Sequence, residues 1–466
     1  MNLRFIGREA ERRQLQQLQK QNFLLVVKGR RRIGKTTLLC KAFPQASYIF
    51  IWPDKSPEWL TQQVGEQLRL PEFKKFSDLL LTLLNQKKMV VLDEFQNFLS
   101  IDRSLYGEMQ KIVDERKAAG AFLQLAVAGS SHSLINKVFS SAAAPLYGRR
   151  TAEITLEHLS PASLFQELKL PLSEFIELWA VFEGVPYYYE LLNLNQNARK
   201  NIQRLLLRKE ALLQEEGKAV LSVEFGSDSK TYNTVLTALA EGKTRLAEIA
   251  SVFDNRSTEV IKYLNLLRNE YRIVQRQTPL LSDPQKSREG EYQIIDNFLS
   301  FWFYFVDKQK QYLEQRRYPE ILAFFETNFN SFVGKMFERF ILLLWREQAF
   351  PLSPHLDKAG RQWGTISSSP PRQNQYEIDL CALNEQSNEI LFGECKWQEN
   401  VDAQKILQEL RQKTAYVSWH NQQRKEYYAL FAKSFKDQEI TDKNVFLYDL
   451  AALEKILRKA SRSTSL

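Results

Sequence analysis

The chain contains few of the residues that mark disulfide-rich, zinc-binding or loop-rich proteins. Its 466 residues include 3 cysteines, 17 glycines, 15 prolines and 4 histidines. Cys40, Cys381 and Cys395 are odd in number and form no Cys-x-x-Cys pair, which argues against a disulfide framework or a zinc ribbon. Sparse glycine and proline favour a chain rich in helix. With so few histidines, we expect any metal to bind oxygen ligands.

Long hydrophobic runs are also missing. The longest apolar run, Phe298 to Val306, is interrupted by Ser300 and falls short of the roughly 18–20 residues that cross a bilayer. The segment from Met1 to Glu9 lacks the basic start and apolar core of a secretory signal. We therefore expect no membrane partner and a cytoplasmic location.

The composition that remains is that of a globular protein with several domains. Hydrophobic residues make up 44% and charged residues 26%, and the length predicts about three or four domains. Lysine and arginine number 64 against 55 acids, a net charge of +9. This balance makes nucleic acid a plausible partner without identifying it.

A phosphate-binding motif follows an apolar run near the start of the chain. The run Asn22 to Lys28 suits a buried parallel strand and leads into G-x-x-x-x-G-K-[ST]. Backbone amides and a helix N-terminus would bind the phosphates of ATP, Lys35 would reach the terminal phosphates, and Thr36 would ligate Mg²⁺. The predicted ATP-binding residues of this loop are Gly29, Arg30, Arg31, Arg32, Ile33, Gly34, Lys35, Thr36 and Thr37.

Two further strand ends carry polar residues suited to ATP hydrolysis. Met89 to Leu92 is apolar and ends in Asp93 and Glu94. We expect Asp93 to hold the Mg²⁺ water shell and Glu94 to polarise the attacking water. Leu123 to Ala128 is a third apolar strand, and Ser130 at its tip could sense the γ-phosphate or cap the following helix.

The middle of the chain predicts helices followed by a hairpin. Apolar residues recur at helical spacing from Pro161 to about Gly217, which we interpret as a helical lid over the nucleotide. Three short helices over 231–269 and two strands, 271–276 and 292–295, then describe a winged helix. Its third helix could present basic and polar residues to double-stranded DNA, or the unit could pack against the ATPase and relay its nucleotide state. These residues are Arg256, Thr258, Lys262 and Asn265. The aromatic segment 297–312 favours an interdomain core.

Carboxylates and a lysine gather in the C-terminal part of the sequence. A helix expected to begin at Asn330 carries Glu338 among large apolar side chains. Two strands, 376–383 and 390–397, are joined by a polar turn, and their pairing would bring Asp379 beside Glu394 and Lys396. Asp379 and Glu394 could hold Mg²⁺ for phosphodiester hydrolysis, with Lys396 orienting the water. An ordinary exposed hairpin with a cross-strand charge pair is the alternative.

Together these motifs resemble the archaeal and bacterial ATPase family of the AAA+/STAND type. The resemblance rests on the segments 5–9, 145–150 and 184–186 together with the phosphate loop, and it covers essentially the whole chain. It implies a winged helix and a C-terminal DUF234-like, restriction-endonuclease-like domain, of which Glu338 and the Asp379, Glu394 and Lys396 pattern are typical. It also implies that Arg8 and Pro186 lie near the base or ribose and that Arg149 or Arg150 senses the γ-phosphate. Glu183 and Gly184 stand where that family often has paired glycines.

We therefore expect an α/β chain with a parallel-sheet ATPase core, a helical lid, a winged helix and a C-terminal α/β nuclease-like domain. The expected boundaries are 1–160, 161–217, 218–296, a helical linker at 297–330, and 331–466. The leading hypothesis is an Mg²⁺-dependent ATPase coupled to DNA binding or processing. The alternative is a signalling switch that binds ATP and holds a partner, with an inactive nuclease-like domain. A homo-oligomer or a protein partner is compatible with either hypothesis.

Overall fold

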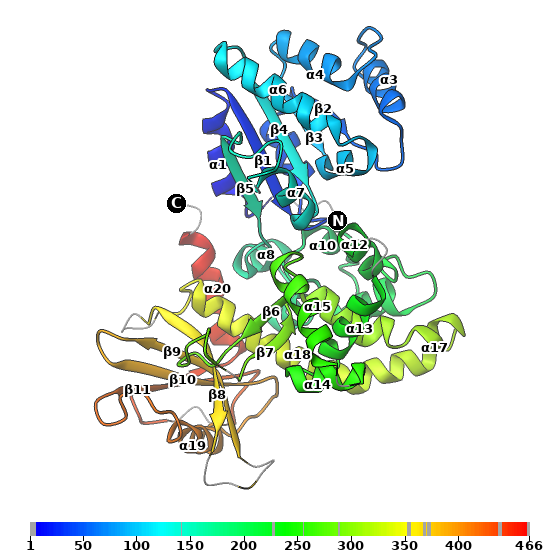
Figure 1. Cartoon of the computed structure of the whole chain (residues 1–466). Coiled ribbons are helices and arrows are strands. Elements are labelled where there is room, and N and C mark those ends of the chain that lie inside the picture. Colours follow the sequence, from blue (N-terminus) through cyan, green and yellow to red (C-terminus); the bar gives the residue numbers. More distant parts are fainter. Residues whose placement is uncertain are drawn as a thin grey trace.

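The structure, a computed structural model, divides visibly into two bodies joined by a narrow waist (Figure 1). It describes residues 6–463 apart from 141, 226–228, 255, 288, 352–355, 367–369, 371–373 and 437–439, so Phe5 of the N-terminal motif lies outside the described residues. One body contains a parallel sheet, and the other contains helices, a hairpin and a second sheet. The expected α/β class is confirmed. No helix in the described ranges combines the length and apolarity needed to cross a membrane.

The N-terminal sheet is parallel throughout, with strand order β2-β3-β4-β1-β5. Helices cover both faces, which explains why β1 is apolar along its length and buried at every position. The strands are β1 (Phe23–Gly29), β2 (Ser47–Phe50), β3 (Val90–Asp93), β4 (Gln124–Gly129) and β5 (Ala152–Leu156). The helices are α1 (Glu9–Leu18), α2 (Lys35–Ala42), α3 (Pro57–Gln67), α4 (Phe76–Asn85), η1 (Phe95–Asn97), α5 (Phe98–Ile101), α6 (Ser104–Ala118) and α7 (His132–Phe139).

This strand order places the expected nucleotide residues at one edge of the sheet. The neighbours β3, β4 and β1 run in the same direction, so their carboxyl ends meet. The phosphate loop follows β1, Asp93 ends β3 and Ser130 follows β4. Ligands of open α/β sheets bind at this edge.

A helical region and a small hairpin unit follow the first sheet. The helical region predicted over 161–217 contains α8 (Pro161–Leu168), α9 (Leu172–Phe182), α10 (Pro186–Glu190), α11 (Ala198–Ile202), η2 (Gln203–Leu207) and the start of α12 (Glu216–Phe225). The next unit contains α13 (Ser229–Ala240), α14 (Leu246–Ala250), η4 (Ser251–Phe253), α15 (Ser257–Asn269) and the antiparallel strands β6 (Val274–Gln277) and β7 (Glu291–Ile294). The first strand of the hairpin begins three residues later than expected, because residues 270–273 form the turn that ends α15.

The aromatic segment forms a core, as expected, and leads into one long helix. In α16 (Asn297–Phe301) and η5 (Trp302–Asp307) most aromatic side chains are buried. After α17 (Lys310–Glu314), α18 runs from Tyr318 to Arg346. The helix expected to begin at Asn330 therefore begins twelve residues earlier, and the proposed boundary at residue 331 falls inside it. Pro319 is accommodated in the first turn, and Gly334 further along does not interrupt the helix.

The C-terminal body contains a mixed sheet with strand order β12-β11-β10-β9-β8. Its strands are β8 (Lys358–Thr365), β9 (Gln375–Asn384), β10 (Glu389–Lys396), β11 (Lys425–Ala432) and β12 (Val445–Tyr448), and its helices are α19 (Ala403–Thr414) and α20 (Leu450–Ser463). The predicted hairpin of β9 and β10 is present and antiparallel. In Figure 1 α20 runs back toward α8, where Gln166 Nε2 donates to the Arg458 carbonyl at 3.5 Å.

Candidate functional site

The phosphate loop has the backbone that its sequence predicts. Gly34 lies at φ +96°, a conformation that favours glycine, directly before the first residue of α2. Arg32 also has positive φ. Successive amides in such a turn, together with the helix N-terminus, form an anion-binding concavity. Thr36 and Thr37 are exposed at the start of α2.

Lys35 is held inside this loop. Its side chain is buried, and Nζ donates to the carbonyl oxygens of Gly29 at 2.9 Å and Arg30 at 3.1 Å. Burial lowers the pKa of Lys35, whereas Glu94 and Asp93 act to raise it. If a triphosphate bound in the loop, its oxygens would replace the two carbonyl oxygens as hydrogen-bond acceptors for the Lys35 ammonium group.

A hydroxyl and a carboxylate meet beside the loop. Thr36 Oγ1 donates to Asp93 Oδ2 at 2.6 Å, and the Tyr48 hydroxyl donates to the same oxygen. Burial and the bond to Asp93 raise the pKa of Tyr48, so the phenol stays protonated. An oxygen pair of this kind fits Mg²⁺, which prefers hard oxygen ligands.

Glu94 and Ser130 come together at the ends of β3 and β4. Glu94 Oε2 accepts hydrogen bonds from Ser130 Oγ at 2.7 Å and Gln96 Nε2 at 2.5 Å. Glu94 has φ +54°, a strained conformation of the kind that clusters at functional sites. The two roles considered for the β4 tip fall on neighbouring residues, because Ser131 caps α7 by accepting from the Leu134 amide.

The three loop arginines, Arg30, Arg31 and Arg32, contact the helical region and the β7–α16 junction. Arg30 Nε lies 2.7 Å from Asp296 Oδ2. Arg32 forms a two-pronged pair with Glu216, at 2.5 and 2.9 Å. Arg31 Nη1 donates to the Ala219 carbonyl at 3.5 Å. These contacts join the loop to the middle of the chain, and the role of the three arginines in ATP binding stays a prediction.

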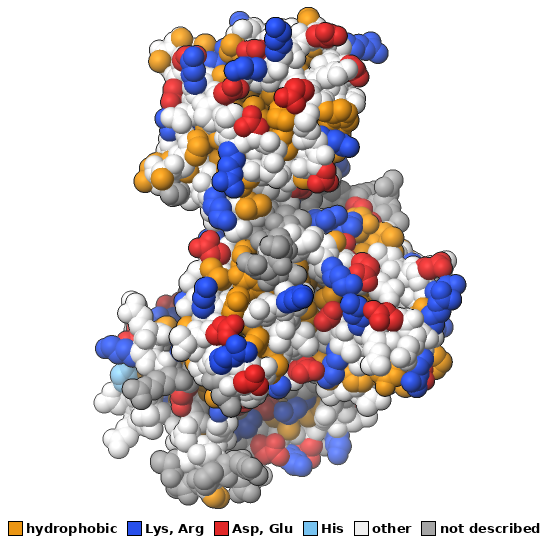
Figure 2. Space-filling view, turned by 45° about the vertical axis from the view of Figure 1, so that its right-hand side comes forward, with side chains coloured by type: hydrophobic (Ala, Val, Ile, Leu, Met, Phe, Trp, Pro, Cys, Tyr) orange, Lys and Arg blue, Asp and Glu red, His pale blue; other side chains and the backbone are white. Residues whose placement is uncertain are grey.

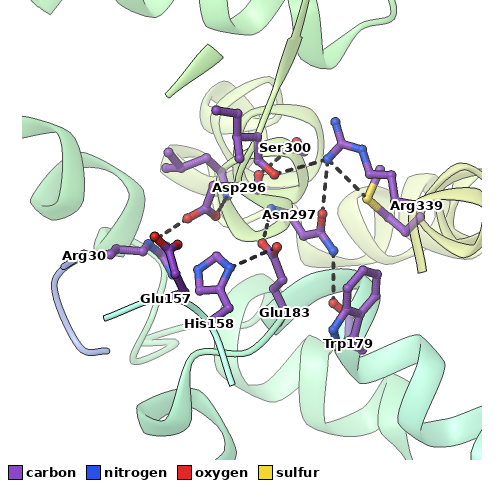
Figure 3. Close-up of polar contacts among 12 residues, drawn as sticks. Arg30, Glu157, His158, Trp179, Glu183, Asp296, Asn297, Ser300 and Arg339 are labelled. Carbon is purple, nitrogen blue, oxygen red and sulfur yellow. Dashed lines mark hydrogen bonds and ion pairs between the residues drawn. The ribbon is translucent and has the colours of Figure 1, made fainter. Parts of the chain in front are cut away.

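The contact at Asp296 continues into a buried polar network (Figure 3). Asn297 donates its amide to Glu183, which pairs with His158 at 3.0 Å. Arg339 of α18 donates to Asn297 Oδ1 at 3.1 Å and to the carbonyl oxygen of Ile294 at 2.6 Å. A chain of polar contacts therefore runs from the phosphate loop to α18.

Arg8 and Pro186 lie near the phosphate loop, and their contact with the base or ribose stays a prediction. The Arg8 guanidinium donates to the carbonyl oxygens of Ile33 at 3.3 Å and Glu157 at 2.7 Å. Pro186 opens α10, in which the Tyr187 ring stacks under Arg32 with 3.9 Å between the guanidinium carbon and the ring centre. Glu183 takes a positive φ of +48°, in the left-handed region that favours glycine.

Arg149 and Arg150 do not reach this site within the same chain. Both precede β5, and the amide of the next residue bonds to Leu24, at the start of β1. They therefore lie at the amino edge of the sheet, opposite the phosphate loop. Arg149 pairs with Asp114 and Arg150 with Glu153, each closer than 3 Å. Parallel strand direction separates the two ends of β5, so neither arginine reaches the phosphate loop of its own chain. The prediction that one of them senses a γ-phosphate therefore applies only to the nucleotide of a neighbouring chain.

The C-terminal acids converge as the hairpin predicted. Asp379 Oδ2 accepts from the Cys395 amide at 2.9 Å, which places it beside Glu394. Burial raises the pKa of Glu338 to about 8, and Asp379 adds to this shift. Burial also raises the pKa of Asp379 to about 7, with the Glu394 charge as the next cause. We call Glu338, Asp379 and Glu394 the carboxylate cluster.

The carboxylate cluster is not arranged as a metal site. Glu394 accepts from Lys396 Nζ at 2.8 Å and from Lys413 Nζ at 2.9 Å. Within the ranges that the structure describes, no three Asp, Glu, His or Cys side chains are grouped to hold a metal ion. Lysine ammonium groups pair with Glu394 in this arrangement, and Mg²⁺ ligation by Glu338, Asp379 and Glu394 stays a prediction.

Several residues at both sites were not predicted. Lys413 lies in α19 and reaches Glu394 only through the packing of that helix on the sheet. Asp296 and Glu216 oppose the loop arginines from segments far away in sequence. Tyr48 shares Asp93 with Thr36 because β2 and β3 are neighbours. No sequence pattern indicated these contacts, because each joins residues that are far apart in the chain and belong to no local motif.

Comparisons with known proteins agree with the nucleotide site. Residues 21–164 match the AAA domain family, and residues 302–406 match DUF234, archaeal and bacterial proteins of unknown function. An uncharacterized protein of Methanocaldococcus jannaschii is 28% identical over 471 residues, covering 96% of this chain and 99% of that protein.

Solved structures give weaker likenesses. A Walker-type ATPase of Pyrococcus abyssi has a TM-score of 0.49 and 17% identity, covering 64% of this chain and 95% of that one. Cdc6p of Pyrobaculum aerophilum has a TM-score of 0.31 and 16% identity, covering 66% and 95%. The family match therefore assigns an AAA domain to residues 21–164, the part of the chain that contains the parallel sheet and the phosphate loop.

Proposed function

We propose that this ATPase is a switch in which ATP binding rearranges the contacts between the phosphate loop and the middle of the chain. The observation that carries the proposal is the pairing of Arg30 with Asp296 and of Arg32 with Glu216. Both arginines belong to the loop that would surround the phosphates, and both acids belong to other regions. Phosphate oxygens and these carboxylates therefore compete for the same guanidinium groups.

Hydrolysis would reverse the switch, and the chain supplies a residue for each part of it. Glu94 is placed to accept a proton from the attacking water, with Ser130 fixing its carboxylate. Thr36 and Asp93 fit Mg²⁺, which would neutralise phosphate charge. Lys35 would bind the terminal phosphates. Strong pairing of the loop arginines with acids favours slow turnover, because each cycle has to break and remake these contacts.

Nucleotide-dependent protection from hydrogen exchange tests the switch. MgATP and MgADP should protect the loop to different extents, and residues 214–219 and 294–298 should change together with it. The Lys35→Ala variant is the control and should show no nucleotide-dependent change. If the wild-type protein binds ATP while both middle segments exchange identically in every state, the switch is refuted.

Nucleic-acid processing is the second candidate function. The convergence of Glu338, Asp379 and Glu394 favours it, as does the exposed face of α15, where Arg256, Thr258, Lys262 and Asn265 are all accessible. The loop between β6 and β7, however, packs on β8, where the Leu280 amide donates to the Arg361 carbonyl at 3.0 Å. On the face of the molecule that Figure 2 shows, acidic and basic side chains are interspersed and form no single large basic area. DNA would thus meet a single helix face.

Incubation with linear and supercoiled DNA separates the two candidates. Cleavage in Mg²⁺ or Mn²⁺ that is lost in Asp379→Ala supports processing by the carboxylate cluster. ATP turnover that rises on adding double-stranded DNA supports coupling through α15, and Lys262→Ala should reduce that rise. Absence of cleavage together with DNA-independent, slow turnover supports the switch with an inactive nuclease-like domain.

A further inference from the structure

The turn between α15 and β6 brings one more positively charged side chain, that of Arg272, close to the phosphate loop. Arg272 in this turn lines a cavity of about 270 Å³ together with Arg30 and Arg31 of the loop and with Ser130 and His132 after β4. Its side chain is exposed, and it forms no ion pair with any described residue. Because Arg272 lies beside the phosphate loop and is not paired with an acid, its guanidinium group is available to an incoming anion.

Backbone contacts fix where Arg272 stands. The Ile295 amide donates to the Ile273 carbonyl at 2.8 Å, and the next residue, Asp296, pairs with Arg30. Figure 3 shows this junction, with Arg30 reaching Asp296 from the loop. Arg272 is therefore one residue from a segment that is itself bound to the phosphate loop, so it does not depend on a long flexible connection.

The conformation of Arg272 is also unusual. It lies at φ +54°, the left-handed region, where the chain turns after the last residues of α15. Tyr271 and Ile273 donate their amides to the carbonyl oxygens of Leu266 and Leu267, at 3.1 and 2.9 Å, and thereby hold the turn. Glycine is the usual residue at such a helix end, and strained non-glycine residues cluster at functional sites.

The charge around the cavity supports an anionic ligand. Three arginines, Arg30, Arg31 and Arg272, line it against two acids, Glu157 and Asp296, and Asp296 is already paired with Arg30. Burial lowers the pKa of His132 to about 4, with Arg272, Lys28 and Lys35 adding to the shift and Glu153 opposing it, so His132 is neutral at pH 7. A terminal phosphate carries the negative charge that such a place attracts.

We propose that Arg272 binds the terminal phosphate of ATP held by its own chain, which rests on the proposed nucleotide site. Within its own chain, this residue takes the part that the family resemblance implies for Arg149 or Arg150, which lie at the opposite edge of the sheet. Because Arg272 belongs to the helix–hairpin unit, its bond to the third phosphate would hold that unit against the ATPase domain in the ATP state. ADP lacks that phosphate and would leave Arg272 unbound.

Titration calorimetry of Arg272→Ala with MgATP and with MgADP tests the proposal. Loss of a charge-assisted contact should raise the Kd for MgATP by about 10-fold or more. The Kd for MgADP should stay within about twofold of wild type, since the lost contact involves only the third phosphate. The matched control is Arg268→Ala, which removes an arginine in the last turn of α15 whose side chain contacts Asn269, and it should change neither value.

Two further variants separate the possible outcomes. Lys35→Ala should weaken both nucleotides; if it does not, the nucleotide site itself fails, whatever Arg272 does. Arg272→Lys keeps a point charge without the two-pronged geometry and should give an intermediate Kd for MgATP. If Arg272→Ala binds both nucleotides like wild type, or loses both equally with an unchanged thermal unfolding midpoint, the proposal is overturned.

Discussion

The phosphate loop and the carboxylate cluster concentrate charged groups of opposite sign, cations in the loop and acids in the cluster. At the loop, Arg30, Arg31, Arg32 and Lys35 stand close together, and acids from other segments balance two of the arginines. In the carboxylate cluster, buried acids crowd together, and lysines balance Glu394 while Glu338 and Asp379 retain protons near neutral pH. At the loop, a more highly charged anion such as a triphosphate can replace the carboxylates that pair with the arginines. In the carboxylate cluster, only another cation can replace the protons and the lysine ammonium groups that balance the acids.

Glu94→Gln should produce the largest effect and confine it to the loop. Loss of a general base lowers turnover by about 10²–10⁴-fold, whereas an amide of the same shape leaves ATP affinity within a few fold. Steady-state ATP hydrolysis and calorimetry measure the two quantities. Asp379→Asn is the counterpart in the carboxylate cluster and should leave ATP turnover unchanged. A variant that hydrolyses ATP at the wild-type rate would remove Glu94 from the mechanism.

Lys35→Ala should weaken ATP binding by about 100-fold, because charge-assisted bonds to phosphate are lost. Lys396→Ala removes a lysine that pairs with Glu394 in the carboxylate cluster and should leave ATP affinity unchanged. The two variants therefore distinguish a lysine that binds phosphate from one that balances an acid. Calorimetric titration with MgATP measures both. Equal affinities in the wild type and Lys35→Ala would refute the nucleotide site.

Asp296→Ser should destabilise the protein by removing one acid from a buried pair. The Arg30 and Asp296 side chains are 15% and 12% exposed, and an unpaired buried arginine costs about 3 kcal/mol. Serine can still cap α16 through the Leu299 amide, as Asp296 does at 2.9 Å, so the loss reports on the charge pair. The measurement is urea unfolding followed by tryptophan fluorescence.

An exposed ion pair supplies the control for Asp296→Ser. Lys75 and Glu108 are 64% and 30% exposed, so Glu108→Ala should cost at most about 1 kcal/mol. Similar losses in the two variants would mean that burial does not strengthen the Arg30 pair.

Glu338→Gln should change how stability depends on pH. The folded pKa of Glu338 is about 8, above its ordinary value of 4.5, so the folded state binds the proton more tightly than the unfolded state. Its contribution is complete below pH 4.5 and is lost as pH rises toward 8. The variant should therefore lose less stability than wild type between pH 5 and 8, a difference on the order of 1–3 kcal/mol. Urea unfolding at several pH values measures it, and an unaltered pH slope would contradict the raised pKa.

The local backbone of both sites could be predicted from the sequence, and their long-range partners could not. Glycine spacing and an apolar run located the phosphate loop, because that geometry is set within nine residues. The β9–β10 pairing followed from alternation, which brought Asp379 to Glu394. The pairing of Arg30 with Asp296 depends instead on how segments 266 residues apart pack, and no periodicity encodes it.

Two features could not be located from local sequence. The family resemblance implies a phosphate sensor at Arg149 or Arg150, but strand direction determines which sheet edge a residue occupies. The helix of Glu338 was expected to begin at Asn330, with Phe324 to Phe329 assigned to a helical linker. Those aromatic side chains in fact continue one face of α18 and pack on Phe301 and Phe305.

The continuity of α18 gives the molecule a mechanical property. Its 29 residues span about 43 Å at 1.5 Å per residue. Its first half contacts Arg199 through Glu326, and its second half holds Arg339 against β7 and turns Glu338 toward the C-terminal sheet. A rigid rod of this length, tilted by about 10° at one end, displaces the other by about 7 Å. A small tilt at the Arg199 end of α18 thus becomes a larger movement at the end that contacts β7 and the C-terminal sheet, with α18 as the lever arm.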